Sequence, residues 1–343
     1  MKTSEFDYIL PEELIAQTPL SDRTGSRMMV VHKNTGEIES TVFSNIVNYF
    51  HEGDVLVRNN TRVIPARLFG TKEVTGAHVE LLLLRQMEDD VWECLAGNAK
   101  VIKEGTVISF HEGELRAQCV GIGEKGIRLM KMLYEGIFNE ILDQLGNVPL
   151  PPYIKEKLDD PERYQTVYAK VRGSAAAPTA GLHFTEDVFA ALRAKGVTIV
   201  DVTLHVGLGT FRPMDTETIE EHVMHEEVYL MCKETADILN QAKADGRRII
   251  AIGTTSVRTL ESVWNRFGRF EECSGETTLF IYPGYAWHTI DAMLTNFHLP
   301  KSTLLMMICS FAGKELIMSS YERAVSERYR FFSFGDCMLI TNE

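Results

Sequence analysis

The sequence predicts an α/β main domain interrupted by an inserted small antiparallel β-barrel domain. Two observations carry this prediction. Between residues 68 and 133, short apolar runs recur at a spacing of about ten residues, separated by glycines and charged residues, as in a small antiparallel sheet or barrel. On the flanks of this stretch, helix-patterned segments alternate with strand-like runs, which is typical of an α/β domain.

The individual elements follow from apolar runs and from their end signals. In the insert, strands are expected at Val79–Leu84, Val91–Ala96, Thr106–Phe110, Leu115–Ile122 and Ile127–Leu133. In the main domain, strand-like runs occupy Val197–Val206, Ile249–Thr254, Leu279–Tyr282 and Met338–Thr341. One helix is expected between the N-cap Thr185 and the stop signal Gly196, and another from Lys233 to Gly246.

The insert divides the main domain into two chain segments. We expect the α/β domain over residues 1–68 and 152–343, and the β-barrel domain over residues 69–151. Pro149, Pro151 and Pro152 lie where the chain re-enters the main domain, and their stiffness suits a linker. A chain of 343 residues is long enough for two domains.

Composition excludes several classes of protein. Apolar residues make up 45% and charged residues 24%, which is ordinary for a globular protein and unlike disordered, collagen-like or coiled-coil chains. The longest apolar run, Leu304–Cys309, is far shorter than the ~20 residues of a membrane-spanning helix. Residues 1–20 have no basic region followed by an apolar block, so no secretory signal is expected. We therefore expect a cytoplasmic protein.

Cysteine spacing argues against structural zinc and disulfides. The six cysteines lie at least 25 residues apart, with no C-x-x-C pair. We expect reduced thiols, mostly packed as small apolar groups.

Net charge is −13, which argues against a global positive field for nucleic acid. From Arg247 to Arg269, however, five arginines stand against Glu261 alone. Charge by itself leaves two interpretations open, a solvated helix face or a local basic patch.

Glycine motifs do not indicate a nucleotide site. Gly121, Gly123 and Gly126 match G-x-G-x-x-G, but a further strand-like run follows them, so we expect a β-hairpin turn. Gly207 and Gly209 form only a G-x-G, and Arg212 stands where a third glycine is required.

Histidines supply the candidate acid-base chemistry. His222, His225 and Glu226 form H-x-x-H-E, whose order differs from that of zinc hydrolases, and we expect no metal there. His183, His205 and His298 each lie where an apolar or strand-like segment meets glycine, proline or a capping residue. In α/β proteins such strand ends carry ligand sites, although a lone histidine is also a common structural residue.

Two further segments end strands with polar residues. Asn59 and Asn60 are unfavourable in a strand, so they indicate turn hydrogen bonding or ligand contact. In Gly253–Arg258, backbone N–H groups could hold a carboxylate or phosphate, while N-capping by Ser256 is the simpler alternative.

At these residues the chain resembles the S-adenosylmethionine:tRNA ribosyltransferase-isomerase family of queuosine biosynthesis (the QueA family). The resemblance runs from Phe6-Asp7-Tyr8 to Gly335-Asp336, and the insert is its least similar part. Between these ends lie the blocks Asn59–Leu68, Ala177–Thr185, His205–Pro213, Met224–Glu226, Gly253–Arg258, Tyr282–Tyr285, Thr295–Leu304 and Tyr329–Ser333. It implies an α/β domain with a β-barrel domain.

The resemblance also implies a reaction. The ribosyl moiety of S-adenosylmethionine is transferred to 7-aminomethyl-7-deazaguanine at the wobble position of tRNA and isomerised, giving epoxyqueuosine-tRNA, adenine and methionine. S-adenosylmethionine is a substrate here, and the scheme requires no metal. Two alternatives stay open: an S-adenosylmethionine-dependent RNA methyltransferase and a non-catalytic tRNA-binding module.

On this resemblance we assign roles as hypotheses. The acid-base groups are His183, His205, His225 and His298, with Glu226 as orienter or alternative base. Contacts to S-adenosylmethionine are assigned to Asn60, Arg62, Thr255 and Arg258. The Arg247–Arg269 cluster, with Lys301, Arg328 and Arg330, becomes a candidate tRNA phosphate surface. We expect a monomer.

Overall fold

The computed structural model describes residues 1–207, 214 and 216–342. The chain divides into two compact units. Unit 1 comprises Met1–Thr61, Pro151–Val171 and Ala177–Glu343, and unit 2 comprises Arg62–Leu150 and Arg172–Ala176. Compared with the borders expected from the sequence, unit 2 also takes in residues 62–68 and 172–176.

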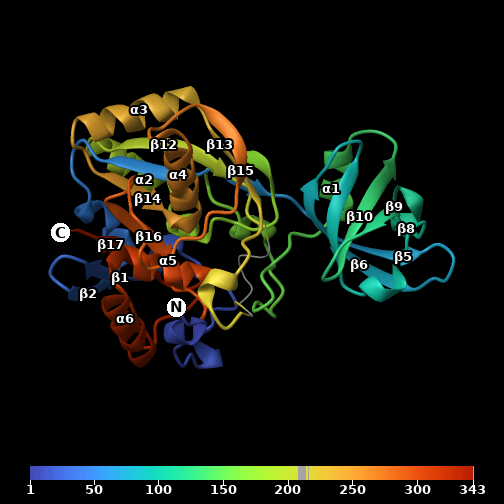
Figure 1. Ribbon diagram of the computed structural model, residues 1–343, viewed down its shortest axis with the longest axis horizontal. Helices are drawn as coiled ribbons and strands as arrows, with labels where there is room; N and C mark the ends of the chain where they lie inside the picture. The colour runs from blue at the N-terminus through green and yellow to red at the C-terminus, as the bar shows by residue number, and fades with distance from the viewer. Residues whose placement is uncertain (208–213, 215, 343) are drawn as a thin grey trace. The chain divides into compact units, whose positions relative to one another are not determined.

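Unit 1 is built on a nine-stranded mixed sheet in the order β15-β13-β12-β3-β14-β16-β17-β1-β2 (Figure 1). At its centre, β12, β3, β14 and β16 are parallel, while β17 is antiparallel to β16. The strands are β1 (Arg27–His32), β2 (Glu37–Val42), β3 (Val55–Asn59), β12 (Thr198–Leu204), β13 (Glu227–Met231), β14 (Ile249–Ile252), β15 (Cys273–Thr277), β16 (Ala292–Asn296) and β17 (Cys337–Thr341).

Helices cover both faces of this sheet, because its central strands are apolar on both sides. On β3, Val55 and Val57 join a core packed against α3, α4, α5 and α6, while Leu56 joins the opposite core, which includes α2 and the 3-10 helix Phe43–Tyr49. The helices are α2 (Glu186–Ala194), α3 (Lys233–Ala244), α4 (Gly253–Phe267), α5 (Thr303–Ala312) and α6 (Lys314–Ser326).

Helix starts and stops agree with most of the expected signals. The Thr185 side chain accepts a hydrogen bond from the Val188 N–H at 3.3 Å and caps α2. N-capping by Ser256 was the wrong alternative, because α4 already begins at Gly253 and the Ser256 hydroxyl donates to the Ile252 carbonyl at 2.7 Å. Gly253 has φ +78°, a conformation that ends the strand and starts the helix.

The expected strand at Leu279–Tyr282 is wrong. The strand of this region is β15, which ends at Thr277, and residues 278–282 form no regular element. Their apolar side chains pack on the large core without strand pairing, and the Leu279 carbonyl accepts a hydrogen bond from the Arg258 Nε at 3.3 Å. The apolar run here thus indicates burial and not a strand.

Unit 2 is a closed six-stranded barrel in the order β10-β7-β6-β5-β8-β9 with the short helix α1 (Phe138–Leu145). Its strands are β5 (Arg67–Lys72), β6 (His78–Gln86), β7 (Val91–Ala96), β8 (Val107–Phe110), β9 (Leu115–Ile122) and β10 (Ile127–Tyr134). Buried and half-buried residues alternate along β7 and β8, as a packed barrel requires. The expected hairpin at Gly121–Gly126 is confirmed, since β9 and β10 pair antiparallel.

A short two-stranded sheet joins β4 (Thr61–Val63) and β11 (Val171–Ser174). All six cysteines are free thiols, and Cys94, Cys119, Cys309 and Cys337 are buried, as expected. Across the described ranges, no single helix is long and apolar enough to cross a membrane. Helices α5 and α6 meet the length and apolarity criteria only when taken together, and this pair is bent by 119°.

Candidate active site

Polar residues gather at one edge of the unit 1 sheet, because its parallel strands all end there. Asn59 ends β3, Asn296 ends β16, and His205 directly follows β12. The edge also receives the beginnings of β17 and β1, since Cys337 lies opposite both Asn296 and Met28. In open α/β sheets this carboxyl edge, at a change of strand direction, is where ligands bind.

A partly open cavity lies at this edge, with about 600 Å³ of empty space that includes open solvent. Hydroxyls, an amide, an imidazole and three aromatic rings converge on it. Its principal lining residues are Tyr153, Thr179, Ala180, Val206, Gly253, Thr254, Thr255, Thr295, Asn296, Phe297, His298, Leu299, Phe332 and Ser333.

The N-terminus of α4 faces the cavity and offers it an anion site. Gly253, Thr254 and Thr255 are the first three residues of the helix and all line the cavity. Thr255 is 8% exposed, and its hydroxyl has no hydrogen-bond partner in the described part of the chain. Free N–H groups and the helix dipole favour an anion at such a point. The unpartnered hydroxyl adds a donor there.

His298 lines the same cavity from the segment after β16. Its Nε2 is hydrogen-bonded to the Thr295 hydroxyl at 2.8 Å, and its backbone N–H donates to the Tyr321 hydroxyl at 2.8 Å. Burial lowers the pKa of His298 to about 3. The imidazole is therefore neutral at physiological pH.

His183 is held in one tautomer by a chain of side chains. The Asn296 amide oxygen accepts from the Thr179 hydroxyl at 2.9 Å, so its NH₂ group faces His183 Nε2 at 3.3 Å. Nε2 accordingly accepts, and Nδ1 carries the proton toward the Ser26 hydroxyl at 3.0 Å. Burial, with the Arg23 and Arg330 guanidinium groups, lowers the pKa of His183 to about 4.

The side chains of Asn59 and Asn60, at the end of β3, both form hydrogen bonds with the end of β12. The buried Asn59 side chain donates to the Leu204 carbonyl at 3.0 Å and accepts from the Leu204 N–H at 3.0 Å, so it extends the sheet ladder. The Asn60 side chain accepts from the Thr203 hydroxyl at 2.7 Å. Both amides thereby fix the backbone that leads into His205.

His205 itself is half-buried beside the cavity residue Val206. Its Nδ1 is hydrogen-bonded to the Thr61 hydroxyl at 2.8 Å, and burial lowers its pKa. Gly209 and Arg212, in the block that begins at His205, lie outside the described residues.

Arg258 does not line the cavity. It is 3% exposed and forms a buried ion pair with Glu227, and its Nε donates to the Leu279 carbonyl. The Glu227 carboxylate also accepts from the Gly207 N–H at 2.9 Å. Arg258 and Glu227 thus hold the segment that follows His205.

Three further predicted site residues are not among those that line the cavity. His225 and Glu226 are exposed, in an irregular connection before β13 rather than on a helix. No metal-binding cluster of His, Cys, Asp or Glu is found among the described residues. Arg62 belongs to unit 2. The structure therefore brings together His298 and Thr255 around one cavity, with His205 and His183 next to its lining residues.

Sequence reasoning missed several residues that shape the site, namely Tyr153, Thr179, Thr295, Asn296 and Ser333. For Asn296 a signal exists, because it closes an apolar run with an amide just as Asn59 does. The hydroxyl residues carry no comparable local signal.

The arginines expected to form a basic surface are largely occupied. Arg248 pairs with Asp54 at 2.6 Å, Arg269 pairs with Glu271 at 2.6 Å, and Arg247 lies 3.4 Å from Asp245. Lys301 pairs with Asp7 at 2.8 Å, and Arg328 lies 3.8 Å from Glu13. These partners neutralise most of the charge that the sequence displays.

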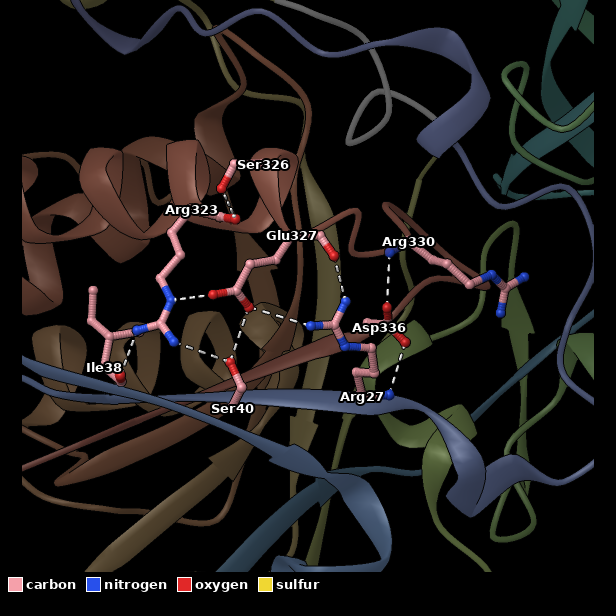
Figure 2. Close-up of polar contacts among 8 residues, drawn as sticks. All are labelled: Arg27, Ile38, Ser40, Arg323, Ser326, Glu327, Arg330 and Asp336. Carbon is pink, nitrogen blue, oxygen red and sulfur yellow. Dashed lines mark hydrogen bonds and ion pairs between the residues drawn. The ribbon is translucent and has the colours of Figure 1, made fainter.

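Figure 2 shows how Arg330 differs from the arginines that pair with a carboxylate. The Asp336 carboxylate accepts from the backbone N–H groups of Arg330 and Arg27, at 2.8 and 2.9 Å, while the Arg330 guanidinium extends away from it. Glu327, by contrast, binds the guanidinium groups of both Arg27 and Arg323. Asp336 therefore fixes the backbone of the loop that carries Phe332 and Ser333 to the cavity.

The fold and the site define an α/β protein with a small-molecule cavity at the carboxyl edge of its sheet and an added β-barrel. Comparison with known proteins is more specific. A family model described as "Queuosine biosynthesis protein" matches residues 3–340. The chain belongs to this family.

Among solved structures, the chain is similar to the crystal structure of the S-adenosylmethionine tRNA ribosyltransferase from Thermotoga maritima. The two share 41% sequence identity over 98% of this chain and 100% of the other, with a TM-score of 0.57. These comparisons confirm the predicted family and the predicted fold class.

Proposed function

We propose that this protein transfers the ribosyl moiety of S-adenosylmethionine to 7-aminomethyl-7-deazaguanine at the wobble position of tRNA and isomerises it. The products are epoxyqueuosine-tRNA, adenine and methionine. The observation that carries the proposal is the 41% identity to a tRNA ribosyltransferase over 98% of this chain and 100% of the other. The polar cavity at the sheet edge supplies a site of suitable chemistry.

S-adenosylmethionine fits the cavity chemistry at three points. Its carboxylate suits the N-terminus of α4, where the Thr255 hydroxyl adds an unpartnered donor. Its ribose hydroxyls suit the hydroxyls and the amide on the opposite strand end, Thr295 and Asn296. The aromatic rings of Tyr153, Phe297 and Phe332 offer apolar faces to the adenine and to the sulfonium cation.

The neutral imidazoles of the site suit proton transfer in the presence of a cation. A sulfonium acidifies the neighbouring ribose methylene, so a base that takes this proton yields an ylide, and adenine then leaves as it is protonated. We assign these transfers to His298 and His205, with His183 behind Asn296. The substrate cation itself opposes protonation of these imidazoles, so they act from the neutral form.

The remaining steps concern the acceptor amine. It loses a proton before it attacks the ribosyl carbon, and a neutral histidine can accept that proton. When the epoxide closes, the C–S bond breaks and methionine leaves as a neutral thioether. These steps use acid-base groups alone, and we propose that the enzyme needs no metal.

Asn60 and Arg258 act in this proposal through the backbone they hold, near His205 and Gly207. For His225, Glu226 and Arg62, substitution by Ala decides whether each belongs to the site: an unchanged rate of turnover removes that residue. We further propose that the enzyme works as a cytoplasmic monomer, which sedimentation of the purified protein and cell fractionation would test.

The decisive experiment is mass analysis of the products after incubation with S-adenosylmethionine and tRNA that carries the deazaguanine precursor. Adenine and methionine, with a heavier modified nucleoside in the digested tRNA, support ribosyl transfer. S-adenosylhomocysteine would instead show a methyltransferase, and absence of any product would overturn the enzymatic proposal. His205→Ala and His298→Ala should each abolish turnover while leaving tRNA affinity nearly intact.

A further inference from the structure

A second cavity adjoins the first and is lined by two arginines, Arg23 and Arg163. It contains about 290 Å³ of empty space that includes open solvent. Ser333 lines both cavities, and His183, which lines the second, is hydrogen-bonded to Asn296 of the first. The other polar side chains of its lining are Asp22, Arg23, Ser26 and Arg163.

Arg330 does not line this cavity, but its guanidinium is held next to the lining residue Pro19. Its Nη2 donates to the Thr18 carbonyl at 2.5 Å, directly before that residue. Arg23 and Arg163 line the cavity together with His183, and the Arg330 guanidinium lies beside the chain segment that begins its wall. Consistent with this placement, burial and then the Arg23 and Arg330 guanidinium groups lower the pKa of His183, and burial and then Arg163 lower the pKa of Arg23.

Backbone carbonyls, rather than carboxylates, hold these three arginines. Arg23 donates to the carbonyls of Leu182 and Glu162, at 3.0 and 3.2 Å, and Arg163 donates to that of Leu20 at 2.5 Å. Carbonyl groups orient a guanidinium without neutralising its charge. Within the described ranges, Arg163 Nε and Arg330 Nη1 have no acceptor at all.

The nearby carboxylates are engaged with the backbone. Asp22 accepts from the Thr24 N–H at 2.8 Å, Asp160 accepts from the Glu162 N–H at 2.9 Å, and Asp336 accepts from two N–H groups. Asp160 and Glu162 still favour the charged form of Arg23, and Asp336 that of Arg330. None forms an ion pair with Arg23, Arg163 or Arg330 in the part of the chain that is described.

We propose that Arg23, Arg163 and Arg330 form an oxyanion site that binds a backbone phosphate of the tRNA substrate. Guanidinium groups are suited to phosphate, and the hydroxyls of Ser26 and Ser333 lie on the same cavity wall. The proposed function assigns the carboxylate of S-adenosylmethionine to the N-terminus of α4, which leaves these cations for another anion. The site would set the target nucleotide against the first cavity. This inference rests on the proposed function, because it takes tRNA as the substrate.

The test measures tRNA and S-adenosylmethionine binding separately for Arg163→Gln and Arg330→Gln in the full chain. We expect each variant to weaken tRNA binding about tenfold near 0.1 M salt and to reduce the slope of log K against log salt by about 0.7–0.9, the value for one lost phosphate contact. The Kd for S-adenosylmethionine should stay unchanged. Arg193→Gln, an exposed arginine on α2, is the matched control and should change neither affinity.

Two other outcomes overturn the proposal. If S-adenosylmethionine binding weakens while tRNA binding does not, the oxyanion is the substrate carboxylate. If neither affinity changes, the arginines bind no substrate anion. Where a Gln variant does not fold, Arg163→Lys and Arg330→Lys replace it: the salt slope must persist because the charge remains, while tRNA affinity falls with loss of the guanidinium fork. This test measures binding and not turnover, so its failure is distinct from failure of the proposed reaction. Wild-type protein that binds tRNA yet forms no product would refute the reaction without refuting the phosphate site.

Discussion

The two units differ most in what they bury. In the described part of unit 2, the buried polar side chains are Arg128 and Ser174, and the barrel interior is otherwise apolar. Unit 1 buries amides, hydroxyls, imidazoles and charges, many of them at the carboxyl edge of its sheet. Burying a polar group costs free energy unless it is hydrogen-bonded.

Buried polar groups serve packing alone in unit 2, whereas in unit 1 they also serve the candidate site. The Arg128 guanidinium donates to three backbone carbonyls, those of Ile102, Ile127 and Ala99, and so serves the barrel alone. In unit 1, Asn296 and His183 satisfy each other next to a cavity, so the same hydrogen bonds stabilise the fold and orient groups toward a ligand. The chemistry proposed above accordingly lies in unit 1, and four predictions test the contrast, from the largest expected effect to the smallest.

The buried ion pair of unit 1 should give the largest effect. Arg258→Met leaves the Glu227 carboxylate buried without its partner, so the free energy of unfolding should fall by about 3–5 kcal/mol in urea denaturation. The double variant Glu227→Gln, Arg258→Met buries no charge and keeps an acceptor for Gly207, so it should recover most of this loss. Arg116→Met, which breaks an exposed barrel ion pair with Glu73, should cost less than about 1 kcal/mol. If Arg258→Met lowers the free energy of unfolding no more than Arg116→Met does, the contrast between the two units is refuted.

The buried histidines should make unit 1 sensitive to acid. The pKa of His183 is about 4 in the folded state and about 6.5 when unfolded, so between these values the unfolded chain binds more protons. The free energy of unfolding should therefore fall by about 3 kcal/mol as pH drops through this window, and His298, with a pKa of about 3, adds to the loss. His183→Gln should flatten the profile of unfolding free energy against pH. The exposed barrel residue His111 is the control, and an equal change from His111→Gln would contradict the prediction.

A steric change should affect the barrel more modestly. A Cβ on Gly70 would lie 2.6 Å from the Phe110 ring and from the Ser109 carbonyl, where β5 passes closely over β8. Gly70→Ala should thus destabilise unit 2 by about 1–3 kcal/mol, measured by loss of amide hydrogen-exchange protection in the barrel strands. At Gly97 the nearest atom would lie at 3.4 Å, so Gly97→Ala should have a smaller effect. Equal loss of protection in both variants would refute the steric explanation.

The smallest effect concerns one hydroxyl in the cavity. Thr255→Val removes the unpartnered donor at the start of α4 and should raise the Kd for S-adenosylmethionine about 3–10-fold by titration calorimetry, as expected for one lost hydrogen bond. Thr259, one turn further along α4, is buried, and its hydroxyl donates to the Thr255 carbonyl at 3.2 Å. Its change to Val should leave the Kd unaltered, and an unaltered Kd in Thr255→Val would place the carboxylate elsewhere.

Sequence patterns predicted the elements of this protein well where the signal that forms or ends an element comes from nearby residues. Thr185 caps α2, the glycines after β9 form a hairpin, and the insert forms a barrel, because caps, turns and period-two alternation depend on nearby residues. Leu279–Tyr282 failed because an apolar run does not say whether a strand partner is available. Strand pairing depends on distant residues.

By itself, therefore, the sequence determined the fold class, the inserted barrel and the strand ends that carry histidines and amides. Only the tertiary structure decided that the ends of β3, β12, β14 and β16 meet at one edge, because this follows from parallel pairing of strands far apart in the chain. It also decided which charges are available. Arg258 is neutralised by Glu227, whereas Arg330 is held by a carbonyl, and charge in sequence becomes charge at a site only when the fold supplies no counterion.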